Sequence, residues 1–201
     1  RVLDGAVVVL DGVAGVEPQT ETNWRLADRH EVPRIAFVNK LDRTGADFER
    51  VVESMRERLG VQALPVHLPI GAEAEFIGVV DLLRMRALTW PRDDASEPVQ
   101  VGAIPSELLA QAQAARARLV EAVVEQDDAA LEAWLRGEEP SVDQLLHCIR
   151  IGVRKRAFVP VLAGSAFRNR GVETLLDAVV DWLPAPGERE GSGNVDVNAP
   201  L

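Results

Sequence analysis

Four consecutive residues, Asn39-Lys40-Leu41-Asp42, hold the side chains with the most specific chemistry in this chain. They directly follow an apolar run over residues 34–38, which is typical of a buried strand. A carboxylate such as that of Asp42 can accept two parallel hydrogen bonds, and guanine presents two adjacent donors, its ring N1–H and its exocyclic amine. Adenine presents a lone pair at the same place and would leave the buried carboxylate unpaired, at a cost of several kcal/mol. The residue types therefore predict a loop that binds guanine and rejects adenine.

The residues beside Asp42 fit such a loop, although a plain turn is the alternative. Lys40 can lay its aliphatic stem along a base and keep its ammonium in water. Asn39 carries both a donor and an acceptor, so it can tie the loop to a neighbouring segment. Asn and Asp are also ordinary turn residues after a strand, and a pattern of three fixed residues arises by chance in some chains. The position after a buried strand favours the ligand loop, because open α/β sheets bind ligands at the carboxyl ends of their strands.

A second junction between an expected strand and a loop follows the apolar run over residues 159–163. Its first residues are Gly164-Ser165-Ala166-Phe167, and small side chains there would let backbone N–H groups approach a ligand closely. A Ser-Ala pair in this place resembles the loop with which GTPases donate a backbone N–H to the guanine carbonyl oxygen, and Ser165 and Ala166 match it. Many GTPases carry Lys at the next position, where Phe167 would instead offer a flat apolar side chain to the edge of the base.

Longer segments of the chain resemble the elongation factor G family of bacterial translation factors. The matching segments follow the family order and cover residues 1–9, 15–19, 39–47, 68–71, 137–140, 164–172 and 175–184. The resemblance implies the GTP-binding domain of a cytoplasmic GTPase that drives translocation on the ribosome, with GTP or GDP as its ligand. It assigns nucleotide binding to six residues, Asn39, Lys40, Asp42, Ser165, Ala166 and Phe167.

Two motifs of such GTPases are absent from the sequence. It contains no Gly-x-x-x-x-Gly-Lys-Ser/Thr loop to hold phosphates, and no Asp-x-x-Gly-His segment, which in the family supplies an Asp near Mg²⁺ and a water-positioning His. We therefore expect a fragment that contains the guanine-reading half of the domain, with no catalytic residue and no metal ligand of its own. Phosphoryl transfer requires a phosphate cradle, a metal ion and an oriented water, so we expect the intact parent to hydrolyse GTP and this chain alone to be inactive.

Two other interpretations stay open. A ribosomal-protection or release-factor GTPase would have the same fold, although residues 68–71 and 78–81 favour elongation factor G. The chain could also be a module that docks on the ribosomal stalk without nucleotide chemistry, because the phosphate-binding motifs are missing from it.

The composition limits the class of protein. Hydrophobic residues make up 47% of the chain, enough for a core, yet no apolar run approaches the ~18 residues that a membrane span requires. Cys148 is the single cysteine, so no internal disulfide can form, and we expect a reducing cytoplasm. The net charge of −10 argues against broad binding to nucleic-acid phosphates and favours a basic protein partner.

Strand and helix patterns alternate near both ends of the chain, which predicts an α/β fold. The expected strands and helices there are 6–10, 17–30, 34–38, 48–59, 159–163 and 172–183. The clearest of them is the helix over 48–59, whose apolar stripe ends at Gly60, a typical C-cap. Between these groups the pattern changes to extended segments and three helices, expected at 64–69, 76–90, 106–126, 128–136 and from Ser141 onward.

This pattern predicts a partial P-loop GTPase-type parallel sheet, without its phosphate-binding half, and an α+β inserted subdomain. Residues 1–66 and 157–185 would form the C-terminal half of the GTP-binding domain, with the insertion at residues 67–156. Residues 186–201 are rich in Gly, Pro and Asn and are expected to be a linker toward a following domain.

Acidic residues recur at helical spacing within the expected insertion, namely Glu121, Glu125, Asp128 and Glu132. An ordinary solvated helix face is one interpretation of them. The resemblance implies another, because the insertion of the family contacts the ribosomal stalk protein, whose C-terminal domain is basic. Charge matching of this kind speeds the encounter of two proteins more than it tightens their binding.

The first expected strand has an apolar edge at Val7–Leu10. In the family a further strand, absent from this sequence, pairs beside it. Because an exposed edge invites pairing with another chain, we expect self-association through these residues.

Overall fold

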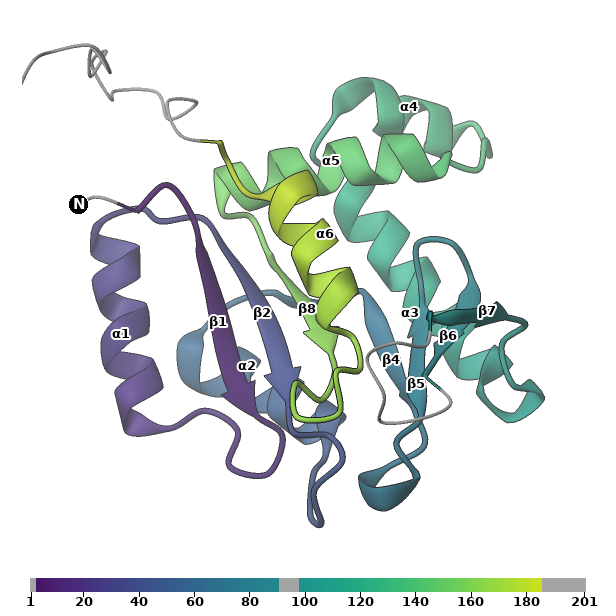
Figure 1. Cartoon of the computed structure of the whole chain (residues 1–201). Helices are drawn as coiled ribbons and strands as arrows, with labels where there is room; N and C mark the ends of the chain where they lie inside the picture. The colour runs from purple at the N-terminus through teal and green to yellow at the C-terminus, as the bar shows by residue number, and fades with distance from the viewer. Residues whose placement is uncertain (1–2, 91–97, 186–201) are drawn as a thin grey trace, which may run out of the picture.

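The computed structural model describes residues 3–90 and 98–185, and these residues form two four-stranded sheets with helices packed around them (Figure 1).

The first sheet is parallel, with the strand order β1-β2-β8-β3. Its strands are β1 (Ala6–Asp11), β2 (Arg34–Asn39), β8 (Val159–Ala163) and β3 (Ala63–Pro65). The two central strands, β2 and β8, are buried along nearly their whole length, as expected for strands covered on both faces. In Figure 1 the arrowheads of β1, β2 and β8 reach the same, lower edge of the sheet, so the loops that follow these strands lie at one edge.

Three helices complete this α/β unit, α1 (Pro18–Arg29), α2 (Phe48–Leu59) and α6 (Val172–Trp182). In Figure 1, α6 crosses in front of the sheet and α2 lies behind it. The predicted stripe of α2 is confirmed, because its inward positions from Phe48 to Met55 are buried. The helix begins after Asp47, whose side chain accepts a hydrogen bond from Arg50 N at 3.0 Å, and it ends at Gly60, whose φ of +65° suits a residue without Cβ.

The second sheet is antiparallel, with the order β4-β5-β6-β7, and belongs to the segment between β3 and β8. Its strands are β4 (His67–Ile70), β5 (Gly78–Asp81), β6 (Arg86–Thr89) and β7 (Gln100–Gly102), with a 3₁₀ turn, η1 (Glu73–Glu75), between the first two. The helices α3 (Ser106–Val124), α4 (Asp128–Leu135) and α5 (Val142–Lys155) follow. These elements confirm the predicted fold class, a parallel sheet with an α+β insertion. The predicted linker at 186–201 lies outside the described residues.

One continuous buried cluster joins the two sheets. The helix α5 packs so closely on the start of β8 that a Cβ on Gly152 would lie 2.4 Å from the ring of Phe158. The chain changes from one sheet to the other between Pro65 and His67, and returns after Lys155, close to the predicted boundaries at 67 and 156. Because the core is continuous across these boundaries, the division into separate folding units stays a prediction.

Candidate nucleotide-binding site

The two predicted loops lie side by side because β2 and β8 are neighbours in the parallel sheet, with Val38 opposite Ala163. Backbone hydrogen bonds continue this pairing into the loops. Gly164 N donates to Val38 O at 3.0 Å, and Leu41 N donates to Gly164 O at 3.3 Å. Gly164 has no room for a side chain, because a Cβ there would lie 2.5 Å from the ring of Phe37. The two loops are more than a hundred residues apart in the sequence, and the pairing of β2 with β8 brings them together.

Asn39 joins the two loops through its side-chain oxygen. Its Oδ1 accepts a hydrogen bond from Lys40 N at 2.8 Å and a second from Ala166 N at 2.8 Å. The first bond stabilises a backbone conformation that is unfavourable for Lys40, whose φ is +63°. The expected tie between this loop and its neighbour is therefore present, and it uses the acceptor of the Asn39 carboxamide.

The ammonium group of Lys40 is ion-paired, although its side chain is 39% exposed. Nζ lies 2.6 Å from Asp11 Oδ2, at the end of β1. Asp11 Oδ1 also accepts hydrogen bonds from the backbone N–H groups of Val13 and Ala14. The Lys40 ammonium, together with these N–H groups, holds the pKa of the Asp11 carboxyl below its ordinary value. Asp11 was not found from the sequence, although its place at the end of a strand beside β2 is a signal that could have found it.

Asp42 lies against a cation that was also not found from the sequence. Its Oδ2 is 3.4 Å from Arg168 Nε, and the Asp42 side chain is only 12% exposed. Arg168 comes from the second loop, where its backbone N–H donates to Ser165 Oγ at 3.4 Å. The carboxylate therefore keeps one oxygen close to Arg168, and each of its oxygens has a second lone pair for another donor.

The three predicted residues of the second loop have different surroundings. Ser165 is fully buried, and its backbone pairs with Arg170 through two hydrogen bonds of 2.9 Å. Ala166 uses its N–H for Asn39, as described above. The Phe167 ring is 92% exposed and does not pack against the other predicted residues. The structure therefore brings Asn39, Lys40, Asp42, Ser165 and Ala166 together and leaves the Phe167 ring in solvent.

The predicted acidic residues are all exposed, but they do not share one helix. Glu121 lies on α3, Glu125 is the C-cap of that helix, and Asp128 and Glu132 lie on α4. Figure 1 shows α4 at the upper end of the molecule, opposite the edge that carries the two loops.

Neither a cluster of metal-ligating side chains nor a membrane-spanning helix is found in the described parts of the chain. These parts contain no group of three or more His, Cys, Asp or Glu side chains that could hold a metal ion. None of their helices is long and apolar enough to cross a membrane.

Fold and loops together define a GTP-binding domain of the translation-factor type. The family described as "Elongation factor Tu GTP binding domain" matches residues 1–185, and the chain belongs to this family. Within it, the chain is similar to elongation factor G. It is 56% identical over 188 residues to elongation factor G of Anaplasma marginale (strain Florida) and of Ehrlichia chaffeensis (strain Arkansas), which confirms the resemblance predicted from its motifs.

These relatives are much longer than the chain. The alignments cover 94% of this chain but 27% of each elongation factor G. A crystal structure of a protein from Thermus thermophilus superposes with a TM-score of 0.84 at 33% identity, and the match covers 96% of this chain and 28% of that one. The chain therefore spans about a quarter of the length of the curated relatives it matches.

Proposed function

We propose that this chain is the guanine-reading part of a translational GTPase of the elongation factor G type. The parent protein would bind and hydrolyse GTP during translation elongation on the ribosome, in the cytoplasm. The observation that carries the proposal is the joined pair of loops, in which Asn39 Oδ1 bridges both loops next to the Asp42 carboxylate. The family match and the identity to elongation factor G support it.

In this proposal Asp42 reads the guanine. Its two oxygens accept the N1–H and the exocyclic amine, while Arg168 stays near Oδ2. The guanine carbonyl oxygen needs a donor from the second loop. Ala166 N–H is bonded to Asn39, whereas Phe167 N–H has no bonded partner among the described residues, so it is the more accessible donor. Lys40, fixed by Asp11, would place its aliphatic stem along the base.

The residues of this chain fit the base of GTP or GDP and do not fit the rest of the nucleotide. No phosphate-binding loop occurs in the sequence, and the described residues contain no cluster of three or more metal-ligating side chains. Much of the affinity of such sites comes from phosphates at a helix N-terminus. We therefore expect weak, base-driven binding by this chain alone and no hydrolysis.

A titration monitored by amide NMR tests the proposal. Guanosine should shift the amide signals of Leu41, Ala166 and Phe167 at millimolar concentration, and adenosine should not. The Asp42→Asn variant should lose guanosine binding about 100-fold, because the charge is lost and an NH₂ donor replaces the acceptor for the exocyclic amine. It should gain xanthosine, whose N1–H and C2 carbonyl match the acceptor and donor of an amide.

Asp177→Asn is the matched control, since Asp177 is an exposed carboxylate on α6. This variant should retain the base preference of the unmodified chain. Equal shifts with guanosine and adenosine, or xanthosine binding by the control as well, would contradict the proposal.

We also propose a partner for the insertion, a basic protein that the resemblance identifies as the ribosomal stalk protein. The support for it is the exposure of Glu121, Glu125, Asp128 and Glu132. In Figure 1, α4, which carries Asp128 and Glu132, lies at the end of the molecule opposite the loop edge, so that a partner there leaves the nucleotide site open. If the chain acts without nucleotide, this surface carries its function.

Self-association through β1 is a third proposal. β1 lies at one end of the strand order and Val9 is 57% exposed. A groove of about 570 Å³ runs between β1 and α1 and is lined by Val7, Val9 and Leu26 among others. Leu10 does not contribute to this surface, because it is buried. An apolar strand from a second copy would fit such an edge.

A further inference from the structure

The turn between β4 and β5, residues 71–76, has an unusual backbone for a surface connection. Gly71 has a φ of +77°, and a Cβ there would lie 1.9 Å from the carbonyl oxygen of Glu75. Glu73 has a φ of +53°, in the left-handed region that residues with a side chain rarely adopt. Backbone held in this way persists where the surrounding structure fixes it, and such positions are frequent at functional sites.

Glu73 contacts the first guanine loop on both sides of Asp42. Its backbone N–H donates to Leu41 O at 3.1 Å. Its side-chain Oε1 accepts a hydrogen bond from Gly45 N at 2.7 Å. The residue immediately before Asp42 and a residue three positions after it are thus both held by one residue of the insertion.

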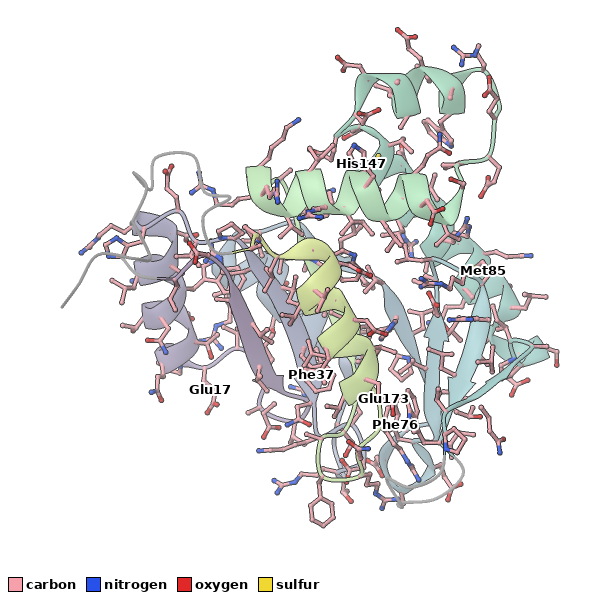
Figure 2. All side chains as sticks on the ribbon, turned by 45° about the horizontal axis from the view of Figure 1, so that its top comes forward. Glu17, Phe37, Phe76, Met85, His147 and Glu173 are labelled. Atoms are coloured by element: carbon pink, nitrogen blue, oxygen red, sulfur yellow. The ribbon has the colours of Figure 1, made fainter. Side chains whose placement is uncertain are left out.

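The same turn also reaches the second guanine loop. Phe76 is fully buried, and its carbonyl oxygen accepts a hydrogen bond from the guanidinium of Arg170, which is 5% exposed. Arg170 in turn pairs with Ser165 through two backbone hydrogen bonds. Figure 2 labels Phe76 in the lower part of the view, and also Glu173 in the first turn of α6.

We infer that the turn 71–76 is a structural part of the guanine site, and that Glu73 is a positioning residue for Asp42. This inference rests on the proposed function. A loop restrained on both sides loses less conformational freedom when its carboxylate pairs with the base, so the affinity for the base is higher. The turn connects two strands of the insertion. A shift of the antiparallel sheet relative to the parallel sheet would therefore change the affinity for guanine, and nucleotide binding would in return change the preferred position of the antiparallel sheet.

Three variants of the 201-residue chain test this role. Glu73→Ala removes the side-chain acceptor for Gly45 N, whereas Glu73→Gln keeps an oxygen at the same place. Glu75→Ala is the control, because Glu75 is an exposed carboxylate of the same turn for which the structure records no side-chain bond. The readouts are guanosine affinity, amide hydrogen exchange of Gly45 without nucleotide, and the thermal midpoint.

We expect Glu73→Ala to weaken guanosine binding about 5- to 10-fold, the effect of one lost hydrogen bond, and to raise Gly45 exchange by a similar factor. Glu73→Gln should restore both values to within about 2-fold of the unmodified chain, and Glu75→Ala should change neither. Affinity is measured at a temperature where every variant is folded, so that stability is separated from binding.

Two outcomes overturn the inference in different ways. If the unmodified chain binds guanosine and Glu73→Ala binds it equally well, then Glu73 only stabilises the fold and the proposed function stands. If the unmodified chain does not bind guanosine, the proposed function fails and this inference fails with it.

Discussion

His67 lies on β4, where its imidazole is buried beside the backbone of Ala163, the last residue of β8. Burial lowers the pKa of His67 to about 4, although Asp81 and the Ala163 carbonyl favour the charged form. Its Nδ1 has no hydrogen-bond partner among the described residues, so a second proton there would be poorly accommodated. His67 is therefore neutral in the folded protein at neutral pH.

The sign of the pH effect follows from this difference in pKa. The unfolded chain binds the proton near the ordinary value of 6.5, and the folded chain does so near 4. Between these values the unfolded state carries more protons, so the free energy of unfolding falls as the pH is lowered from 6.5 to 4. At about 1.36 kcal/mol per pKa unit, the full loss is about 3 kcal/mol.

Urea unfolding at several pH values between about 7 and 4.5 measures this loss, with tryptophan fluorescence as the signal. Other groups titrate in this range, so the informative quantity is the difference between the unmodified chain and His67→Gln. The variant should be less stable at neutral pH, yet it should lose less stability on acidification. His147→Gln is the control, because His147 is exposed on α5. Equal pH dependence in the His67 variant and the unmodified chain would refute the reasoning.

Three further predictions concern the site and the two interaction surfaces. Arg168→Gln removes the cation beside Asp42 and should weaken guanosine binding about threefold, which is less than the loss of one full charged hydrogen bond would cause. Arg168→Lys should have an intermediate affinity. An unchanged affinity would show that the ion pair does not contribute to binding. If the proposed contact with a stalk protein forms, Glu125→Lys should slow association with that protein in stopped-flow measurements and change stability by less than about 0.5 kcal/mol. An unchanged association rate would rule out this surface. Val9→Lys should convert a self-associated chain into a monomer in light scattering, and a monodisperse monomer before substitution would contradict pairing through β1.

The local features of the fold were predictable because each depends on neighbouring residues. The apolar stripe of α2 and its C-cap at Gly60 follow from helical periodicity. The capping box at the start of α5 follows from two residues three positions apart, and Ser141 Oγ does accept from Gln144 N at 3.2 Å. In the same way, the two loops were found because each follows an apolar run.

The contacts that complete the site were not predictable, because they join distant parts of the chain. Lys40 pairs with a residue of another strand, and Asp42 lies near a cation from the loop after β8. Periodicity gives no information about such pairs, since the packing of the sheet decides which side chains meet. The expected contact of Phe167 with the edge of the base stays a prediction, and nothing in the local sequence indicates that this residue is 92% exposed.

Several contacts between the insertion and the parallel sheet lie close to the two proposed guanine loops. His67 lies beside the last residue of β8, just before Gly164. Glu73 and Phe76 form hydrogen bonds with Gly45 and Arg170. A subdomain attached only for partner binding could be joined at any edge of the sheet. These contacts at the carboxyl ends of β2 and β8 couple the position of the insertion to the geometry of the proposed base site. If that site binds guanine, thermodynamic linkage requires that a partner which binds one position of the insertion better than another also changes the affinity for guanine.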